Sequence, residues 1–252
     1  MEYHIRKEGN FEYVQEGEGR PLILLHGLMG ALSNFQGIVD YFSKNGYQVI
    51  IPTLPIYSLP ILNTNVKSIA SFTRKFIDHK GFKDYFLLGN SLGGHVGLVH
   101  ALKHHEDMAG LILTGSSGLY EKAFGDTFPR REDKEYIRVK AQEVFYDPAV
   151  ATDELVDDIF ETINDRNRLI RILAIAKSAI RHNMSKDLQH IPVPTLLIWG
   201  KQDGVTPPEV AEEFHAKLPQ SELFWIDKCG HAPMMEHPDR FNEILADWLN
   251  RH

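Results

Sequence analysis

The sequence lacks the features that mark several special classes of protein. It has a single cysteine, Cys229, in 252 residues, so no disulfide can form within the chain. Proteins of reducing compartments commonly have this composition. The longest apolar runs, such as residues 22–25, fall far short of the roughly 18 residues needed to cross a bilayer. The N-terminal residues are charged and do not resemble a signal peptide. We therefore expect a cytoplasmic protein without a membrane span.

An excess of positive charge is also missing. The 27 Lys and Arg residues are outnumbered by 34 Asp and Glu residues, which gives a formal net charge of −7. Proteins that bind nucleic acid usually carry a basic patch, and this sequence has no long basic cluster. The histidines lack metal-ligand spacing, since the adjacent His104 and His105 cannot both face one ion from a helix. These patterns disfavour a nucleic-acid partner and a metal site.

Hydrophobic residues make up 43% of the chain, enough for a sizeable core. Short continuous apolar runs predict buried strands, and segments with helical spacing lie between them. Such alternation predicts an α/β protein with a mostly parallel sheet covered on both faces. The turn Gly9-Asn10 predicts an opening hairpin. Further strands are expected near residues 21–25, 48–51, 84–88, 111–114, 195–199 and 223–226, and helices near 35–44, 66–80, 92–104, 208–218 and 240–249.

One stretch, residues 119–190, breaks this alternation. It has charged segments of helical character, near 132–145, 152–162 and 164–181, and no convincing strand. An insertion of this length is a subdomain and not a simple crossover connection. We therefore predict a core domain formed by residues 1–118 and 191–252 and a helical cap formed by residues 119–190. The cap should cover the carboxyl ends of the strands, where open α/β sheets bind ligands.

The strongest chemical signal is the segment Gly89-Asn90-Ser91-Leu92-Gly93. It matches Gly-x-Ser-x-Gly, and it lies between a predicted strand and a predicted helix, the context of a nucleophile elbow. In such a turn the serine is held in a strained backbone conformation that exposes its hydroxyl. The small residues on either side allow the strand and helix to approach closely. This pattern predicts that Ser91 is a catalytic nucleophile.

A serine nucleophile needs a base, and the base needs an acid that orients it. His231 follows the strand at 223–226, and Asp203 follows the strand at 195–199. Both therefore lie at the same sheet edge as Ser91, and we predict that they complete a catalytic triad. Asp227 and Glu236 remain alternative acids because both are near His231 in the sequence.

Backbone amides are expected to stabilise an oxyanion beside Ser91. The N–H of Leu92 lies at the start of a helix, where it has no intrahelical partner and benefits from the helix dipole. The second donor is predicted to be the N–H of Leu28, in the loop His26-Gly27-Leu28-Met29-Gly30 that follows an early strand. His26 is expected to hold this loop through its ring and not to act as a base.

These motifs, in this order, resemble the α/β-hydrolase superfamily over the whole chain. The resemblance implies a sheet of about eight strands and hydrolysis through a covalent acyl-enzyme. It also implies that neither cofactor nor metal takes part and that the substrate is a small molecule bound by a monomer or homodimer. One departure from the family pattern is the segment Pro52-Thr53-Leu54-Pro55-Ile56-Tyr57-Ser58, where relatives often have an acidic residue and a Gly-rich turn.

Three functions remain open. We expect first a serine hydrolase that cleaves a small or medium carboxylic ester. The segment 89–95 also resembles carbon–carbon bond hydrolases that act on dienoic ring-fission products, although no tryptophan follows His231. The third alternative is a small-ligand receptor that keeps the hydrolase fold and triad.

Fewer signals point to the substrate-binding residues. Met29, Tyr57 and Met234 are predicted to line the site, with core packing as the alternative for the methionines. Four arginines of the predicted cap could grip an acidic substrate or form a solvated charged face: Arg166, Arg168, Arg171 and Arg181.

Overall fold

A computed structural model of the chain describes residues 4–30, 32–120 and 130–252. Its centre is an eight-stranded sheet in the order β1-β2-β4-β3-β5-β6-β7-β8. Strands β3 to β8 are parallel, whereas β1 and β2 pair antiparallel at one edge. The bounds are β1 Arg6–Glu8, β2 Phe11–Glu16, β3 Arg20–Leu25, β4 Tyr47–Pro52, β5 Tyr85–Asn90, β6 Met108–Thr114, β7 Thr195–Gly200 and β8 Ser221–Ile226.

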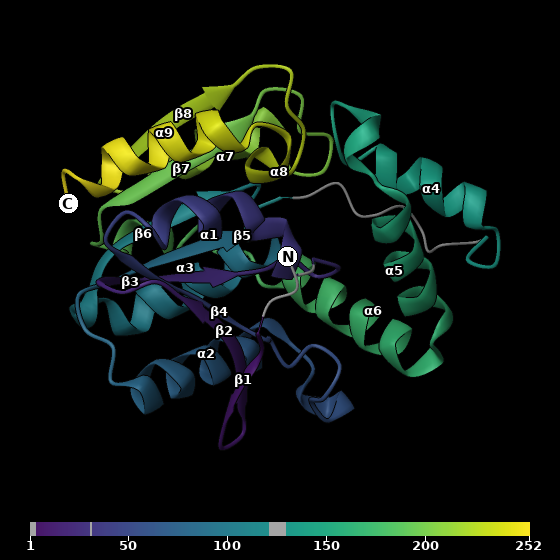
Figure 1. The fold of residues 1–252 in the computed structure, drawn as a ribbon, viewed down its shortest axis with the longest axis horizontal. Helices are drawn as coiled ribbons and strands as arrows, with labels where there is room; N and C mark the ends of the chain where they lie inside the picture. The colour runs from purple at the N-terminus through teal and green to yellow at the C-terminus, as the bar shows by residue number, and fades with distance from the viewer. Residues whose placement is uncertain (1–3, 31, 121–129) are drawn as a thin grey trace.

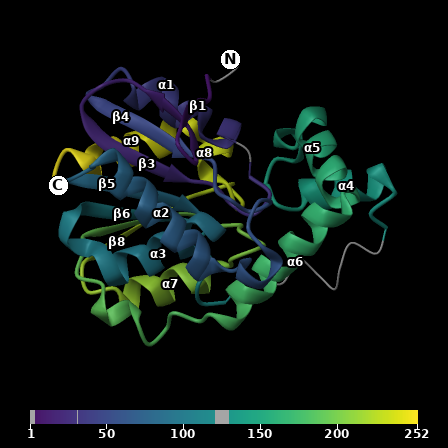
Figure 2. The same cartoon turned by 90° about the horizontal axis from the view of Figure 1, so that it is seen from below.

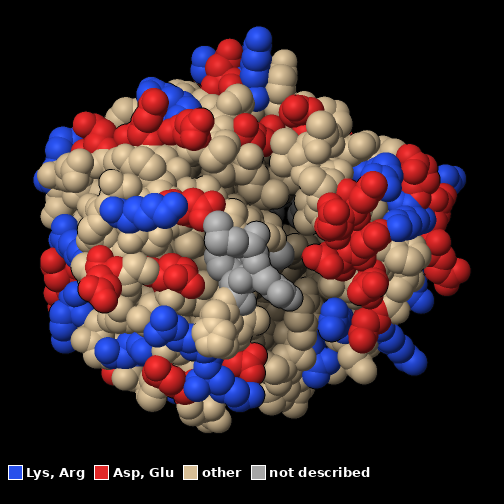
Figure 3. Space-filling view, in the orientation of Figure 1, with Lys and Arg blue, Asp and Glu red and all other residues tan. Residues whose placement is uncertain are grey.

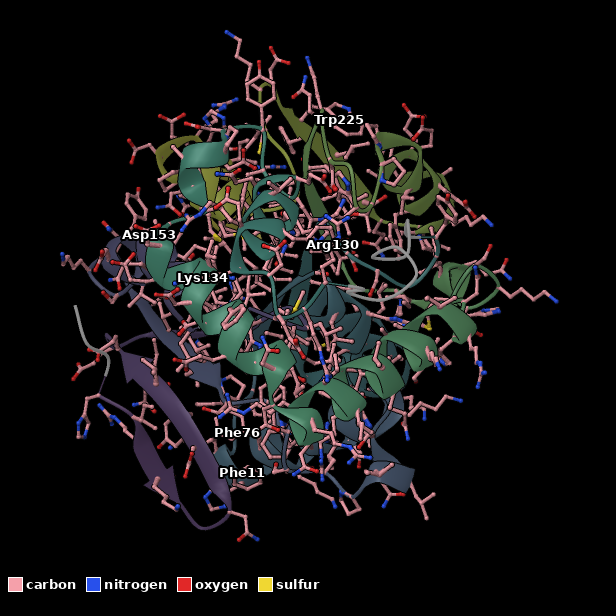
Figure 4. All side chains as sticks on the ribbon, turned by 90° about the vertical axis from the view of Figure 1, so that its right-hand side faces the viewer. Phe11, Phe76, Arg130, Lys134, Asp153 and Trp225 are labelled. Carbon is pink, nitrogen blue, oxygen red and sulfur yellow. The ribbon has the colours of Figure 1, made fainter. Side chains whose placement is uncertain are left out.

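Two hydrophobic layers lie on the two faces of this sheet. Successive residues of a strand point to opposite faces, so Leu22 and Leu24 of β3 join one layer and Ile23 and Leu25 join the other. Because both faces are covered, the central strands are continuous apolar runs. The pair Phe11 and Phe76, with ring centroids 5.5 Å apart, joins β2 to a covering helix (Figure 4).

The covering helices lie on both sides of the sheet (Figures 1 and 2). Helices α2 (Val66–Lys80), α3 (Leu92–His104) and α7 (Pro208–Lys217) pack on one layer, and α1 (Gln36–Phe42) and α9 (Pro238–Leu249) on the other. Their ends follow from local chemistry. For example, the Asn65 side chain caps α2 by accepting the Ser68 N–H, and Gly81 ends it with a left-handed φ of 66°.

Three consecutive helices are here called the helical insertion: α4 (Lys134–Gln142), α5 (Asp153–Asn164) and α6 (Arg166–Arg181). Each begins at a side-chain cap, supplied by Asp133, Thr152 and Asp165. The helical insertion stands beside the sheet and not within its layers (Figures 1 and 2). Figure 4 faces it and labels Lys134 and Asp153 at the starts of α4 and α5.

The predicted α/β-hydrolase fold and its eight-stranded, mostly parallel sheet are confirmed. Predicted and observed elements differ mainly at their ends, as for the helix expected at 35–44, which is a 3₁₀ turn (Leu32–Phe35) followed by α1. A short helix, α8 (Pro233–Glu236), was not predicted. The domain boundaries at residues 118 and 191 stay a prediction. No helix in the described ranges is long and apolar enough to cross a membrane.

Candidate active site

The carboxyl ends of four parallel strands bring the predicted site residues to one edge of the sheet. Ser91 directly follows β5, and the loop that begins at His26 follows β3, the neighbour of β5. Asp203 lies in the loop after β7, and His231 lies in the loop after β8. Parallel pairing alone therefore collects these residues, which are up to 205 positions apart for His26 and His231.

Ser91 has the strained backbone of a nucleophile elbow. Its φ of 54° and ψ of −119° are unusual for a residue with a side chain, and it forms the N-cap of α3. The strand and helix on either side touch through glycine. A Cβ on Gly89 would overlap the backbone of Gly93, and a Cβ on Gly93 would overlap the carbonyl of Leu25. The motif thus has glycine where the packing leaves no room for a side chain.

Asp203 and His231 form a buried pair. His231 Nδ1 lies 2.9 Å from Asp203 Oδ2 and 3.1 Å from Oδ1, and Asp203 is 3% exposed. The carboxylate also accepts the N–H groups of Val205 and Thr206 at 2.8 and 2.9 Å, and the Thr206 hydroxyl at 2.8 Å. These donors satisfy the buried charge and fix its direction, as an acid that orients an imidazole requires.

The backbone of His231 is held from two sides. The Asn90 side-chain amide donates to the carbonyls of His231 at 3.3 Å and Thr114 at 3.0 Å, which ties the elbow to the histidine loop. On the other side, the His231 N–H donates to the carbonyl of Val144, just beyond α4 in the helical insertion, at 2.9 Å. Gly115, with φ of 51°, leaves room for the ring, because a Cβ there would lie 2.8 Å from His231 Nδ1.

The loop after β3, which was predicted to supply an oxyanion donor, lies against the elbow. A Cβ on Gly27 would be 3.3 Å from Ser91 Cβ. Leu92 is the first residue of α3, so its N–H has no partner within the helix. His26 donates from Nδ1 to the Gly27 carbonyl at 2.9 Å, and its Nε2 accepts the Leu54 N–H at 3.4 Å. Burial lowers the pKa of His26, which keeps this ring neutral in its structural role.

The alternative acids have other contacts. Asp227 is exposed, accepts a hydrogen bond from Gln202 at 3.3 Å and pairs with Lys201 at 3.9 Å. Glu236 accepts the N–H of Gly230 at 2.7 Å and so contacts the backbone of the histidine loop. Asp203 is the acid placed at His231 Nδ1.

This arrangement can be compared with known proteins. A family model described as the alpha/beta hydrolase fold matches residues 20–238. The chain belongs to this family.

Relatives of this alpha/beta hydrolase are hydrolases too. It is 48% identical to a crystal structure of an alpha/beta hydrolase enzyme from the metagenome of lagoon sediments at Mar Chica, Morocco, with 98% of each chain covered and a TM-score of 0.82. It is 28% identical to a 2-hydroxy-6-oxononadienedioate/2-hydroxy-6-oxononatrienedioate hydrolase of Comamonas testosteroni, over 92% of this chain and 88% of the other. An uncharacterized hydrolase of Bacillus subtilis (strain 168) is 25% identical over 95% of this chain and 93% of the other.

The predicted substrate-binding residues of the hydrolase lie in different surroundings. Met29 is partly exposed in the loop after β3. Tyr57 is 39% exposed, and the Arg168 guanidinium lies 5.5 Å from its ring centroid. Partial burial raises the pKa of the Tyr57 hydroxyl. Met234 is 2% exposed and belongs to the hydrophobic layer under α1 and α9. It therefore packs in the core, the alternative considered for the methionines.

The four arginines all lie on α6, which has no acidic residue. Arg166, Arg168 and Arg181 are exposed, and Arg171 donates to the backbone carbonyls of Leu59 at 3.1 Å and Asn167 at 3.1 Å. The hydrolase is hollowed between the sheet edge and the helical insertion (Figure 3). Arg166 and Arg181 thus lie on a solvated face, Arg168 lies beside the Tyr57 ring, and Arg171 holds α6 against the core.

Two residues that contact the site were not predicted from the sequence, Asn90 and Thr206. Asn90 occupies a variable position of the elbow motif, and Thr206 lies three residues beyond the acid it contacts. The spacing Asp-x-x-Thr after a predicted strand could have indicated the Asp203 turn, since such side chains commonly cap backbone N–H groups. The described residues contain no group of three or more His, Cys, Asp or Glu side chains that could hold a metal ion.

Proposed function

We propose that this alpha/beta hydrolase is a serine hydrolase that cleaves a small or medium carboxylic ester through an acyl-enzyme. Ser91 attacks the ester carbonyl, and His231 accepts the serine proton and then returns it to the leaving alcohol. Asp203 fixes the imidazole tautomer with its proton on Nδ1, so that Nε2 can act as base. Water, activated by His231, then cleaves the acyl-enzyme.

The Asp203–His231 pair at the Ser91 elbow is the observation that carries this proposal. A buried carboxylate 2.9 Å from Nδ1 stabilises the imidazolium that forms as Ser91 loses its proton. The strained φ of 54° at Ser91 supports the same role, because strain of this kind is concentrated at functional sites.

The N–H groups of Leu28 and Leu92 are proposed to stabilise the oxyanion. The closeness of Gly27 to Ser91 and the position of Leu92 at the start of α3 support this assignment. Each such donor typically lowers the activation free energy by about 3 kcal/mol. The helical insertion is proposed to cap the site, with Met29 and Tyr57 in contact with substrate, whereas Met234 packs in the core.

Carbon–carbon bond hydrolysis is the second candidate. It is favoured by the similarity to the Comamonas testosteroni hydrolase, which is 28% identical, and by the shared serine machinery. Arg171 of α6 is engaged by backbone carbonyls, whereas Arg168 lies 5.5 Å from the ring centroid of Tyr57 and would be the arginine available to a dienoate carboxylate.

The test combines a fluorophosphonate probe with p-nitrophenyl esters of increasing acyl length. We expect labelling at Ser91, fast turnover of one range of chain lengths, and loss of both in Ser91→Ala. The matched control is Ser71→Ala, which removes an exposed hydroxyl on α2 and should change neither.

The outcomes separate the candidates. Labelling without ester turnover, together with bleaching of a coloured ring-fission dienoate, would favour the carbon–carbon hydrolase. Labelling with neither reaction would favour a receptor that keeps the triad. Unchanged ester turnover in Ser91→Ala would contradict the assignment of the nucleophile.

A further inference from the structure

The carboxylate of Glu236 joins two segments that are about 85 residues apart in the sequence. Its Oε1 accepts the N–H of Gly230, next to His231, at 2.7 Å. Its Oε2 accepts the N–H of Tyr146 at 2.7 Å and that of Asp147 at 3.3 Å, both beyond α4 in the helical insertion. One side chain therefore holds the histidine loop with one oxygen and the helical insertion with the other.

The two segments also touch directly. The His231 N–H donates to the Val144 carbonyl at 2.9 Å. A Cβ on Gly230 would lie 2.6 Å from the same carbonyl and 3.0 Å from the backbone of Phe145. The segment 144–147 therefore lies directly against the backbone of His231, and the Glu236 carboxylate closes a ring of hydrogen bonds around this contact.

On the basis of the proposed function, we infer that Glu236 is a positioning residue that couples the seating of the helical insertion to the placement of the His231 imidazole. Three backbone N–H groups converge on one carboxylate, and charge-assisted hydrogen bonds of this kind are stronger than neutral ones. If the carboxylate is lost, Gly230 and Tyr146 lose their shared acceptor, and both the base and the insertion can shift. Glu236 touches no reacting atom and acts only through His231 and the insertion.

The test is Glu236→Gln, which keeps the shape of the side chain. An amide has one acceptor oxygen, so in either orientation its NH₂ group faces the Gly230 N–H or the N–H groups of Tyr146 and Asp147. Competent sites are first counted by fluorophosphonate labelling, and kcat is then expressed per labelled site. We expect kcat per site to fall about 10- to 100-fold, because misplacement of a catalytic group by about 1 Å has effects of this size. KM should change much less.

Two further readouts distinguish positioning from mere support of the fold. Hydrogen exchange should become faster in both segments, 144–147 and 229–231, and not in one alone. The acid limb of the pH profile of kcat/KM should move to lower pH, because an imidazole displaced from the Asp203 carboxylate loses the partner that favours its protonated form. The matched control is Glu243→Gln, an exposed carboxylate on α9 that pairs with Arg240 at 3.0 Å and should change none of these quantities.

Each outcome has a separate meaning. Fewer labelled sites with unchanged kcat per site and an unshifted pH profile would show a folding role and overturn the inference. Exchange that becomes faster in one segment only would also overturn it, because the coupling would be absent. A wild-type protein that is neither labelled nor active would remove the proposed function itself, and the positioning role with it, before any variant is compared.

Discussion

The acid loop after β7 and the helical insertion are held in place by different kinds of contact. Asp203 accepts bonds from Val205 and Thr206, two and three residues away, and these local bonds fix the turn in which the carboxylate meets His231. The insertion is attached by partners far away in the sequence. Examples are the Val66 N–H, which donates to the Ser178 hydroxyl at 3.2 Å, and the Arg171 bond to Leu59.

This difference separates a part of the site that is fixed by local packing from a part that is fixed by long-range contacts. The elbow and acid loop consist of close backbone packing and short-range hydrogen bonds, which can change little without strain. The insertion is joined to the core by the apolar side chains of Ile175 and Ala179 and by directional contacts, among them that between His95 and His182, whose ring nitrogens lie 3.0 Å apart. Each such contact can be removed separately, and three predictions use this contrast.

Asp203→Asn should have the largest effect. An amide in place of the carboxylate favours the wrong imidazole tautomer, and we expect a fall in kcat of about 10⁴-fold with the fold intact. The measurement is kcat for the best p-nitrophenyl ester, with circular dichroism as the check on folding. Asp227→Asn, which alters an exposed acid near the same histidine, is the control and should retain activity. If the two variants lost activity equally, the acid assignment would be wrong.

Gly93→Ala should show how tightly the elbow is packed. The new Cβ would overlap the Leu25 carbonyl, a backbone atom that cannot move alone, and we expect a loss of about 3 kcal/mol or more in the free energy of unfolding. Gly204→Ala is the control in the acid loop, because its nearest neighbour would be the Glu143 carbonyl at 4.0 Å. It should stay within about 0.5 kcal/mol. Urea unfolding measures both, and equal losses would contradict the packing argument.

The smallest effect concerns acid and the contact between His95 and His182. Burial, and secondarily the charge of His182, lower the pKa of His95 from 6.5 to about 3. The unfolded chain therefore binds a proton that the folded chain excludes, and stability is lost as the pH falls from about 6.5 toward 3. We expect His95 to account for about 2 kcal/mol of the loss in unfolding free energy between pH 7 and pH 5.

Urea unfolding of His95→Gln at the two pH values checks this share. The loss of unfolding free energy between pH 7 and pH 5 should be smaller than in the wild type by that amount. Part of the loss should remain in the variant, because burial also lowers the pKa of His100 to about 3. His190→Gln, at an exposed position, should leave the pH dependence unchanged. An identical loss in His95→Gln and the wild type would show that this histidine does not couple folding to pH.

The same contrast explains what the sequence could predict. The elbow, the acid loop and the succession of strands and helices along the chain depend on local patterns. Ser91, Asp203 and His231 could therefore be predicted from the sequence. The partners of Glu236 could not, because they depend on where residues 144–147 pack after the chain has folded. Its closeness to His231 in the sequence indicated a rival acid, whereas its contacts are with backbone N–H groups. The arginines of α6 were ambiguous for the same reason, since a charge pattern does not reveal which face is solvated.

The single cysteine has a practical consequence for following the helical insertion in solution. Cys229 is fully buried, and burial together with Glu236 raises the pKa of its thiol. Thiol reagents attack through the thiolate, so this side chain should stay unlabelled in the native protein. A cysteine introduced at Ile180 on α6, where the native side chain is 52% exposed, would then be the sole site of dye attachment. Fluorescence could report the movement of the insertion without first removing Cys229.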